Sequence, residues 1–518
     1  MQTSQLQPIT GTPCEVPLPK NFSTIFFEIA IILVNLQKNK NTVINQKLTP
    51  KQKALAVNLD PLIYGTFAEI GAGQETVRHF FRAGGASGTI AKAMSAYDKD
   101  FSDAIYGKEV KNRYVTQNRL RKMLRYEVSL IEERLTRDVL PGRKFFSYAN
   151  TVTTINFDKT LKGHGWVGIR FQQDENQSYN EIVLHVKFNE NDATLQQETL
   201  GSLGVNLIYG AFHYADNPRK LIDSLFDDIS IDKLEIDMID FSGPSFQYVD
   251  NRLMSLQLVK SGMTDAVIFN SEGSNMLPAD LLYKKNIFAV RGSFKPVTLV
   301  NIDMFDNGLE MFLKDAECST EETVVLFEIT IANLRASGDI DERDFLDRVD
   351  VLGKLGYTVI ISNFSEYYRL IDYFSSYSPQ KIGVGMGVNN LLMVFDENYY
   401  KNLSGGILEA FGKFFRKDMR VYLYPYKDPN THKLLTSLNL KVNDNLKDLY
   451  KYFIQNHRIV DIKNYNPSHA EIYSREVLNK IINHEKGWEN QLPDGVAEMI
   501  KERGMFGYKE ELSLKEFT

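Results

Sequence analysis

Cysteine is scarce in this chain of 518 residues, which contains only Cys14 and Cys318. Two thiols far apart in sequence cannot build the disulfide framework of a small secreted protein. They are also too few for a zinc site of the Cys/His cluster type, and the eight histidines form no HxxxH pair. A reducing, cytoplasmic location is therefore expected.

A strong excess of charge and long apolar runs are also lacking. The net charge of -6 gives no overall attraction for nucleic acid or anionic membranes. The apolar run at 25–34 is interrupted by Glu28 and is shorter than the roughly 20 residues that span a bilayer. We expect neither nucleic acid nor membrane as a partner. GxSxG, Walker A and EF-hand patterns are absent, so serine hydrolases, P-loop NTPases and calcium sensors are not indicated.

Residues 1–48 differ from the rest of the chain. Their last part, QKNKNTVINQKL, is polar and typical of a linker. We expect a disordered or misassigned extension, with the folded protein beginning near Thr49.

Residues 49–200 predict a helical region followed by a short antiparallel sheet. Leu120, Leu124, Val128 and Ile131 have helical spacing. The expected strands are rich in β-branched and aromatic residues and are separated by polar breaks; they span 152–157, 166–171 and 181–188.

Residues 201–445 alternate between short apolar runs and amphipathic helical segments, which predicts an α/β domain with a mostly parallel sheet. A (β/α)8 barrel and a doubly wound open sheet both fit this pattern. Residues 446–518 are expected to form a charged helical tail on the outside. The predicted strands are 205–212, 234–241, 265–270, 287–291, 324–330, 358–362, 382–387 and 421–424.

Polar residues gather at the expected carboxyl ends of these strands, where ligands bind in both architectures. The segment after the strand at 287–291 is the main candidate. There Gly292 would allow close approach of a phosphate, and the following helix N-terminus would favour an anion. The expected binding residues are Gly292, Ser293, Phe294 and Lys295, and the other polar strand-end residues include Asp237, Asp240, Asn270, Glu272, Arg291, Glu328 and Asn363.

The sequence GSFKPVTLVN at 292–301 resembles the nucleotidyltransferase signature GxFxPxTxxH of nicotinamide mononucleotide adenylyltransferases. This resemblance implies that the loop wraps nucleotide phosphates, with Arg291, Thr298 and Asn301 as catalytic candidates. Asn301 stands where the family has histidine, and it cannot carry the charge of an imidazolium. The family places the motif on its first strand, whereas several βα units are expected before it here.

Longer segments at 69–107, 250–266 and 291–304 are similar to a large, poorly characterised bacterial family. Its members are often labelled nicotinamide or nicotinate mononucleotide adenylyltransferases, and some are labelled TonB-dependent receptors. The resemblance covers most of residues 50–460. It implies a folded cytosolic protein without supplying a mechanism.

Two further candidates have both a functional and a structural interpretation. Gly84, Gly85 and Ser87 could cradle a phosphate through backbone N–H groups, or they could form a tight turn. Asp237 and Asp240 could hold Mg²⁺, or they could lie on the solvent-facing side of a strand.

The sequence thus predicts an α/β protein that binds a small phosphorylated ligand or nucleotide near Arg291–Thr298. The expected cofactor is Mg²⁺ with the nucleotide, and the chemistry is nucleotidyltransferase-like at most. The alternative is a non-enzymatic scaffold or interaction protein. The sequence leaves open whether the protein is an enzyme and what its oligomeric state is.

Deleting residues 1–48 should leave the melting temperature nearly unchanged, because the polar composition of this segment does not match that of a core. Thermal unfolding of the full and shortened chains measures this. A drop of more than a few degrees would show that the apolar run at 25–34 packs against the folded body.

Overall fold

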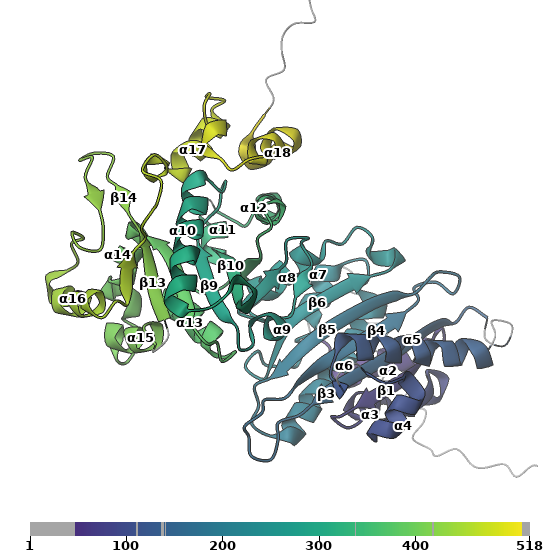
Figure 1. The fold of residues 1–518 in the computed structure, drawn as a ribbon. Helices are drawn as coiled ribbons and strands as arrows, with labels where there is room; N and C mark the ends of the chain where they lie inside the picture. Colours follow the sequence, from purple (N-terminus) through teal and green to yellow (C-terminus); the bar gives the residue numbers. More distant parts are fainter. Residues whose placement is uncertain are drawn as a thin grey trace, which may run out of the picture. The chain divides into compact units, whose positions relative to one another are not determined.

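The computed structural model describes residues 47–109, 112–135, 139, 141–336, 338–416 and 419–509 (Figure 1). The chain divides into two units, Met1–Leu48 and Thr49–Thr518. The prediction of an extension at 1–48 lies outside the described residues except for Lys47 and Leu48. Among the described residues, no helix combines the length and apolar character that crossing a membrane requires.

A six-stranded sheet occupies the first half of Thr49–Thr518, in the order β2-β1-β3-β4-β5-β6. β1 is parallel to β2 and β3, and the remaining neighbours are antiparallel. The predicted antiparallel pairing is confirmed for β4 and β5, whereas only the first two residues of the strand expected at 152–157 belong to β3, and β1 and β2 lie in the region expected to be helical. The strands are β1 (Ile63–Ile70), β2 (Ile90–Met94), β3 (Lys144–Thr153), β4 (His164–Phe171), β5 (Asn180–Phe188) and β6 (Leu234–Ser242).

Helices cover both faces of this sheet. Successive side chains of a strand point to opposite faces, and here both faces carry apolar side chains. Tyr148 belongs to the apolar cluster beneath the larger group of helices, and its neighbour Ala149 belongs to the cluster on the opposite face. The larger group comprises α2 (Pro50–Asn58), α3 (Glu75–Ala83), α6 (Ala193–His213), α7 (Pro218–Ser224) and α8 (Asn251–Lys260). The opposite face carries α4 (Lys99–Tyr106) and α5 (Gln117–Arg134).

The prediction of a strand at 205–212 is wrong, because these residues form the C-terminal part of α6. Nearly all of them are buried, and a short run that is apolar on every side has no periodicity to separate a buried helix from a buried strand. The expected domain boundary at residue 200 lies inside α6. The predicted strand at 234–241 is real, but it pairs antiparallel with β5 and so belongs to the first sheet.

The second sheet has eight strands in the order β16-β13-β12-β9-β10-β11-β7-β8. Six strands are parallel, and β7 and β8 form an antiparallel pair at one edge. The prediction of a mostly parallel α/β sheet is confirmed, and the sheet is open. The strands are β7 (Ala266–Phe269), β8 (Asn275–Met276), β9 (Asn286–Arg291), β10 (Thr323–Thr330), β11 (Val359–Ser362), β12 (Ile382–Gly387), β13 (Met419–Tyr424) and β16 (Ile459–Asp461).

The parallel strands are doubly wound. When β9 is counted as the first strand, the order reads 3-2-1-4-5-6, and the chain reverses direction after β11 to place β12 beside β9. The helices before the reversal, α10 (Leu299–Ala316) and α12 (Glu342–Lys354), pack on one face. The next four helices pack on the other face: α13 (Tyr367–Ser375), α14 (Val388–Val394), α15 (Gly406–Phe414) and α16 (Lys447–Gln455).

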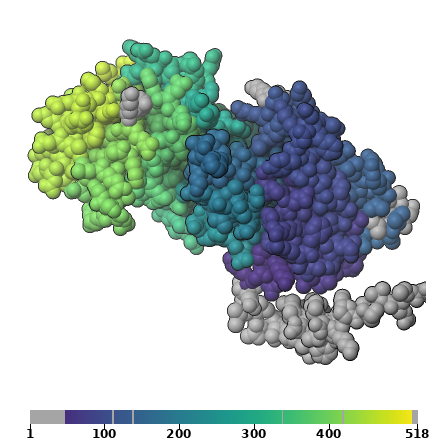
Figure 2. All heavy atoms as spheres, turned by 90° about the horizontal axis from the view of Figure 1, so that it is seen from below, coloured from purple at the N-terminus to yellow at the C-terminus, as the bar shows by residue number. Residues whose placement is uncertain are grey.

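Shorter elements complete the chain. The expected helical tail also supplies β16, the sixth strand of the parallel series. Figure 2 shows that the purple-to-blue segments and the green-to-yellow segments each gather in one region of the surface. The remaining helices and strands are α9 (Pro278–Leu282), α11 (Ile331–Leu334), α17 (Ser474–Ile482), α18 (Val496–Arg503), β14 (Tyr426–Lys427) and β15 (Leu434–Leu435).

Phe288 of β9 lies at the centre of the second core. Its ring centroid lies 5.6 Å from that of Phe312 and 5.9 Å from that of Tyr422. We expect Phe288→Ala to lower the free energy of unfolding by about 3–5 kcal/mol, because neighbouring side chains on a rigid sheet cannot refill the cavity. Phe157→Ala is the matched control, since Phe157 is 99% exposed and its loss should cost less than about 0.5 kcal/mol. Urea unfolding compares the two, and equal midpoints would contradict this description of the core.

Candidate functional site

The predicted phosphate loop joins the end of β9 to the start of α10. The backbone N–H of Gly292 donates to the carbonyl oxygen of Glu328 at 3.0 Å, which extends the pairing of β9 with β10 by one residue. Phe294 then turns back into the core, where its ring centroid lies 5.2 Å from that of Phe327. A Cβ on Gly292 would come within 2.8 Å of the Phe294 ring. The loop is therefore anchored by one aromatic side chain and leaves no room for a side chain at 292.

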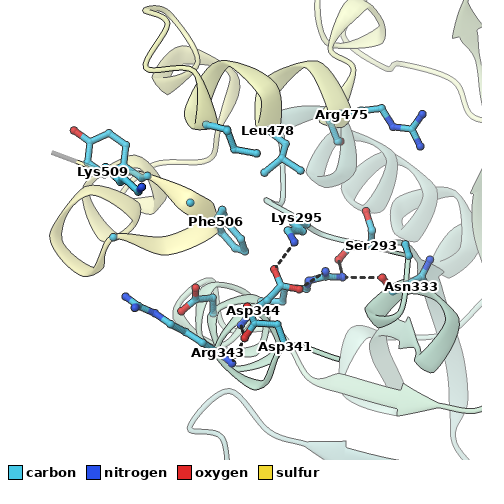
Figure 3. Close-up of a pocket in the computed structure, with 18 residues that line it drawn as sticks. Ser293, Lys295, Asn333, Asp341, Arg343, Asp344, Arg475, Leu478, Phe506 and Lys509 are labelled. Atoms are coloured by element: carbon cyan, nitrogen blue, oxygen red, sulfur yellow. Dashed lines mark hydrogen bonds and ion pairs between the residues drawn. The ribbon is translucent and has the colours of Figure 1, made fainter. Parts of the chain in front are cut away.

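The Ser293–Lys295 part of this loop lines a cavity of about 1010 Å³ (Figure 3). Other walls come from the N-terminal half of α12, from α17 and from the segment after α18. Basic side chains outnumber acidic ones around it. The basic residues are Lys295, Arg343, Arg348, Arg475 and Lys509, and the acidic residues are Asp341, Asp344 and Asp347.

A buried ion network fixes the wall beside Lys295. The Nζ atom of Lys295 lies 3.0 Å from Oδ1 of Asp344, and Arg348 donates to the other oxygen of the same carboxylate (Figure 3). Arg348 also donates from Nη1 to the carbonyl oxygen of Ser293 at 3.0 Å, so it braces the loop directly. Its side chain is 2% exposed, and its Nε has no hydrogen-bond partner in the part of the chain that the structure describes. This buried donor is left unsatisfied by the described residues, at a cost in free energy.

Arg291 lies on the opposite face of the sheet from Lys295. Its guanidinium donates to both carboxylate oxygens of Glu328, at 2.7 and 2.8 Å, and stacks 4.2 Å from the ring centroid of Tyr367. Burial alone would lower the pKa of Arg291, but the Glu328 carboxylate raises it above its ordinary value. Ser362 donates to Glu328 at 2.6 Å and completes the cluster. Arg291 and Glu328 thus pair with each other, and neither lines the cavity beside Lys295.

Thr298 and Asn301 form the N-terminal cap of α10. The backbone N–H and the hydroxyl of Thr298 lie 3.0 and 2.9 Å from the side-chain oxygen of Asn301. The Thr298 hydroxyl also lies 3.0 Å from that of Ser474, and the residue is fully buried. The geometry gives both residues a structural part, and their catalytic role stays a prediction.

Gly84, Gly85 and Ser87 lie in the turn between α3 and β2, next to the six-stranded sheet. Both glycines have positive φ, of 89° and 76°. The carbonyl oxygen of Gly84 accepts a hydrogen bond from Asn58 at 2.8 Å. These residues are not brought together with Ser293 and Lys295, and the geometry is that of an interelement turn.

Asp237 and Asp240 have separate partners. Asp237 is buried beside His185 and Lys187, whereas Asp240 accepts from Arg121 at 2.6 Å and from Asn251. Within the described residues, no three His, Cys, Asp or Glu side chains converge as metal ligands would. Mg²⁺ binding by this pair stays a prediction. Glu272 lines a different cavity, of about 360 Å³.

Several residues that line the cavities are not indicated by the sequence. Arg348 and Arg475 belong to helical segments whose charge pattern is that of an ordinary solvated face, so no local signal marks them. His164 and His185 lie on adjacent strands of the antiparallel sheet and meet across it. Antiparallel pairing of the two predicted strands could have placed these histidines near each other, because His164 pairs with Lys187, two residues from His185.

We expect Glu328→Gln to lower the free energy of unfolding by about 3–5 kcal/mol, because it leaves the buried Arg291 without a counter-charge. Replacing both residues by methionine should restore most of the loss, since the ion pair is then removed as a whole. Glu133→Gln is the control, because Glu133 and Arg134 form an exposed pair and should contribute less than about 1 kcal/mol. Urea unfolding midpoints decide the matter, and a double variant as unstable as the single one would contradict it.

Comparisons with known proteins give little further guidance. No protein-family model matches the chain, and no curated protein matches it. Among solved structures, a CinA superfamily protein from Enterobacter cloacae is 13% identical, covering 33% of this chain and 97% of its own, with a TM-score of 0.24. A competence/damage-inducible protein from Agrobacterium tumefaciens is 14% identical, covering 32% and 96%, with a TM-score of 0.23. A similar protein from Enterobacter asburiae is 13% identical, covering 32% and 98%, with a TM-score of 0.22. TM-scores this low carry no conclusion about the function of this chain, so its family is not assigned.

Proposed function

We propose that the protein binds a phosphorylated small molecule, of the nucleotide class, in the cavity beside Ser293–Lys295. One observation carries the proposal: this loop is the first βα turn of a doubly wound sheet and opens into a cavity with an excess of basic side chains. In open α/β sheets, ligands bind outside the carboxyl ends of the strands, and the first βα turn commonly holds phosphate.

The order of the strands strengthens the resemblance to the nucleotidyltransferase signature. β6 belongs to the other sheet and β7 is antiparallel, so β9 is the first strand of the parallel series. The motif that follows β9 therefore occupies the position that the signature has in its family. This supports a nucleotide as the ligand, with Mg²⁺ accompanying its phosphates.

The contacts available favour binding more than adenylyl transfer. Lys295 is the basic residue of the loop itself, and Arg475 of α17 lines another wall of the same cavity. Asn301 supplies its carbonyl oxygen to the cap of α10 and brings no positive charge toward a phosphate. Loss of one donor to a developing negative charge costs on the order of 3 kcal/mol in a transition state. We therefore infer that any nucleotidyl transfer by this chain is slow.

Lys295→Met should abolish stabilisation by a phosphorylated ligand, because it removes the charge while keeping most of the apolar stem. Thermal unfolding is followed with ATP, with inorganic pyrophosphate and with adenosine, each with and without Mg²⁺. A ligand at 100 times its Kd should stabilise the unchanged protein by about 2.7 kcal/mol. We expect this effect for ATP and pyrophosphate and not for adenosine.

Lys401→Met is the matched control, because Lys401 is exposed and does not line the cavity. It should respond to ATP as the unchanged protein does. No stabilisation of the unchanged protein by ATP or pyrophosphate would overturn the proposal and favour the scaffold interpretation. A response that survives in Lys295→Met would place the phosphate elsewhere.

A further inference from the structure

A second cavity, of about 1050 Å³, is lined by two hydrogen-bonded histidines, neither of which lines the cavity beside Lys295. It opens on the face of the six-stranded sheet that carries α5, where Trp166 and Met238 line it and pack in the same cluster as that helix. His164 and His185 lie in its wall. They come from β4 and β5, which are adjacent in the sheet (Figure 1).

Asp237, His185 and His164 form a hydrogen-bonded relay that leads from the buried Asp237 carboxylate to the cavity. Oδ1 of Asp237 lies 2.6 Å from Nδ1 of His185. Nε2 of His185 lies 3.3 Å from Nδ1 of His164. The Asp237 side chain is fully buried and the His185 side chain is 2% exposed, whereas His164 is only partly buried.

These contacts determine which nitrogen of each ring carries the proton, since the hydrogen bond of one ring nitrogen sets the state of the other. An ionised Asp237 accepts the Nδ1–H of His185. Nε2 of His185 is then an acceptor and takes the Nδ1–H of His164. The lone pair of a neutral His164 is left on Nε2, the atom that is not engaged in the relay.

The surroundings keep Asp237 ionised and His164 neutral. Burial alone would raise the pKa of Asp237, but Lys187, 3.1 Å away, and His185 hold it below its ordinary value. Burial lowers the pKa of His164, and the neighbouring His185 lowers it further. The other charged or titratable groups that face this cluster are Glu235 on β6, Asp280 on α9, Tyr373 on α13 and Tyr377 just after that helix.

The nucleophile that this base would activate is water. Thr153 lies directly opposite His164 on β3, and its hydroxyl donates to the carbonyl oxygen of Thr154. It therefore does not make the contact to His164 that an activated hydroxyl nucleophile needs. A histidine whose ring nitrogen is unprotonated near neutral pH is well suited to take a proton from water.

The charge of the walls indicates an uncharged substrate. Three basic side chains, Arg113, Lys162 and Lys187, are balanced by three acidic ones, Glu235, Asp265 and Asp280. Lys187 also forms ion pairs with Glu235 and with Asp237 of the relay. The rest of the wall contains aromatic and apolar residues that suit an apolar body: Tyr114, Val115, Trp166, Met238, Met276 and Leu277. A phosphate would find no excess of positive charge here.

We propose that this cavity is a separate hydrolytic site for an uncharged ester, in which His164 acts as the general base that activates water. Nε2 of His164 takes a proton from water while the water oxygen bonds to the carbonyl carbon. The bond from that carbon to the ester oxygen then breaks, and His164 returns the proton to the departing alcohol. His185 and Asp237 are positioning residues, which hold the His164 ring and stabilise its charged form.

Hydrolysis of p-nitrophenyl acetate by the full chain tests this proposal, with the buffer rate subtracted. General-base catalysis typically contributes a factor of about 10²–10⁴, so His164→Gln should lower the protein-dependent rate at least about tenfold. The rate should rise with pH to a plateau, with a midpoint below the ordinary pKa of histidine, 6.5. Asp237→Asn should lower the rate and move this midpoint, which a purely structural residue would not do in a folded variant.

His457→Gln is the matched control, because His457 is exposed and does not line the cavity; its rate should be unchanged. An undiminished rate in a folded His164→Gln variant would overturn the proposal. Diethyl pyrocarbonate, which acylates neutral imidazole, gives a second measurement on the unchanged protein. We expect the modification rate of His164 to reach half of its maximum below pH 6.5, because burial lowers its pKa. Modification of His457 alone would also overturn the proposal.

Discussion

The alternation of side chains along β9 controls the position of the loop at 292–295. This strand lies in the middle of a sheet with helices on both faces, so each of its side chains enters one of two separate cores. Phe288 and Val290 pack toward α10, and Ala289 packs toward α13. Arg291 therefore emerges beside α13, whereas the chain after Gly292 turns toward α10 and α12. Because Arg291 is one position beyond Val290, its side chain lies on the opposite face of the sheet from the loop that it was expected to assist.

Burial then dictates how charges are used at these strand ends. Arg291 is enclosed almost completely, and a buried guanidinium needs a counter-charge and hydrogen bonds. Glu328, its partner in the register of β10, supplies both. The same rule applies in the six-stranded sheet, where Lys187 lies between Glu235 and Asp237. Such pairs hold their side chains in place. A cation that a carboxylate already neutralises is not available to bind an anionic ligand.

The two large cavities differ in what remains after this pairing. Beside Lys295, Asp344 is shared by two cations, and further basic residues line the wall. Around His164, the charges cancel and aromatic side chains occupy much of the wall. The net charge of -6 for the whole chain describes neither cavity. Local balance, set by which side chains the fold brings together, gives the first cavity an excess of basic side chains and the second equal numbers of basic and acidic ones.

Local patterns in the sequence were sufficient for the α/β class, for β4, β5 and β6 of the first sheet, for most strands of the second sheet, and for a turn at 292–295, but they missed β1 and β2. These features depend on period-two alternation, short apolar runs and turn residues, which act over a few positions. The α6 helix was the main failure, because a segment buried on all sides carries no periodic signal.

Strand order and the partners of charged residues required the tertiary structure. The sequence left the barrel and the open sheet equally possible, and only the pairing of β9 with both β10 and β12 distinguishes them. Arg348 reaches the loop at Ser293 across 55 positions of the chain, and Asp237 meets His185 across 52. The sequence by itself determined the α/β class and most strands of the second sheet. Tertiary structure decided which charges are neutralised and which cavities form, because these depend on contacts between segments that no local pattern encodes.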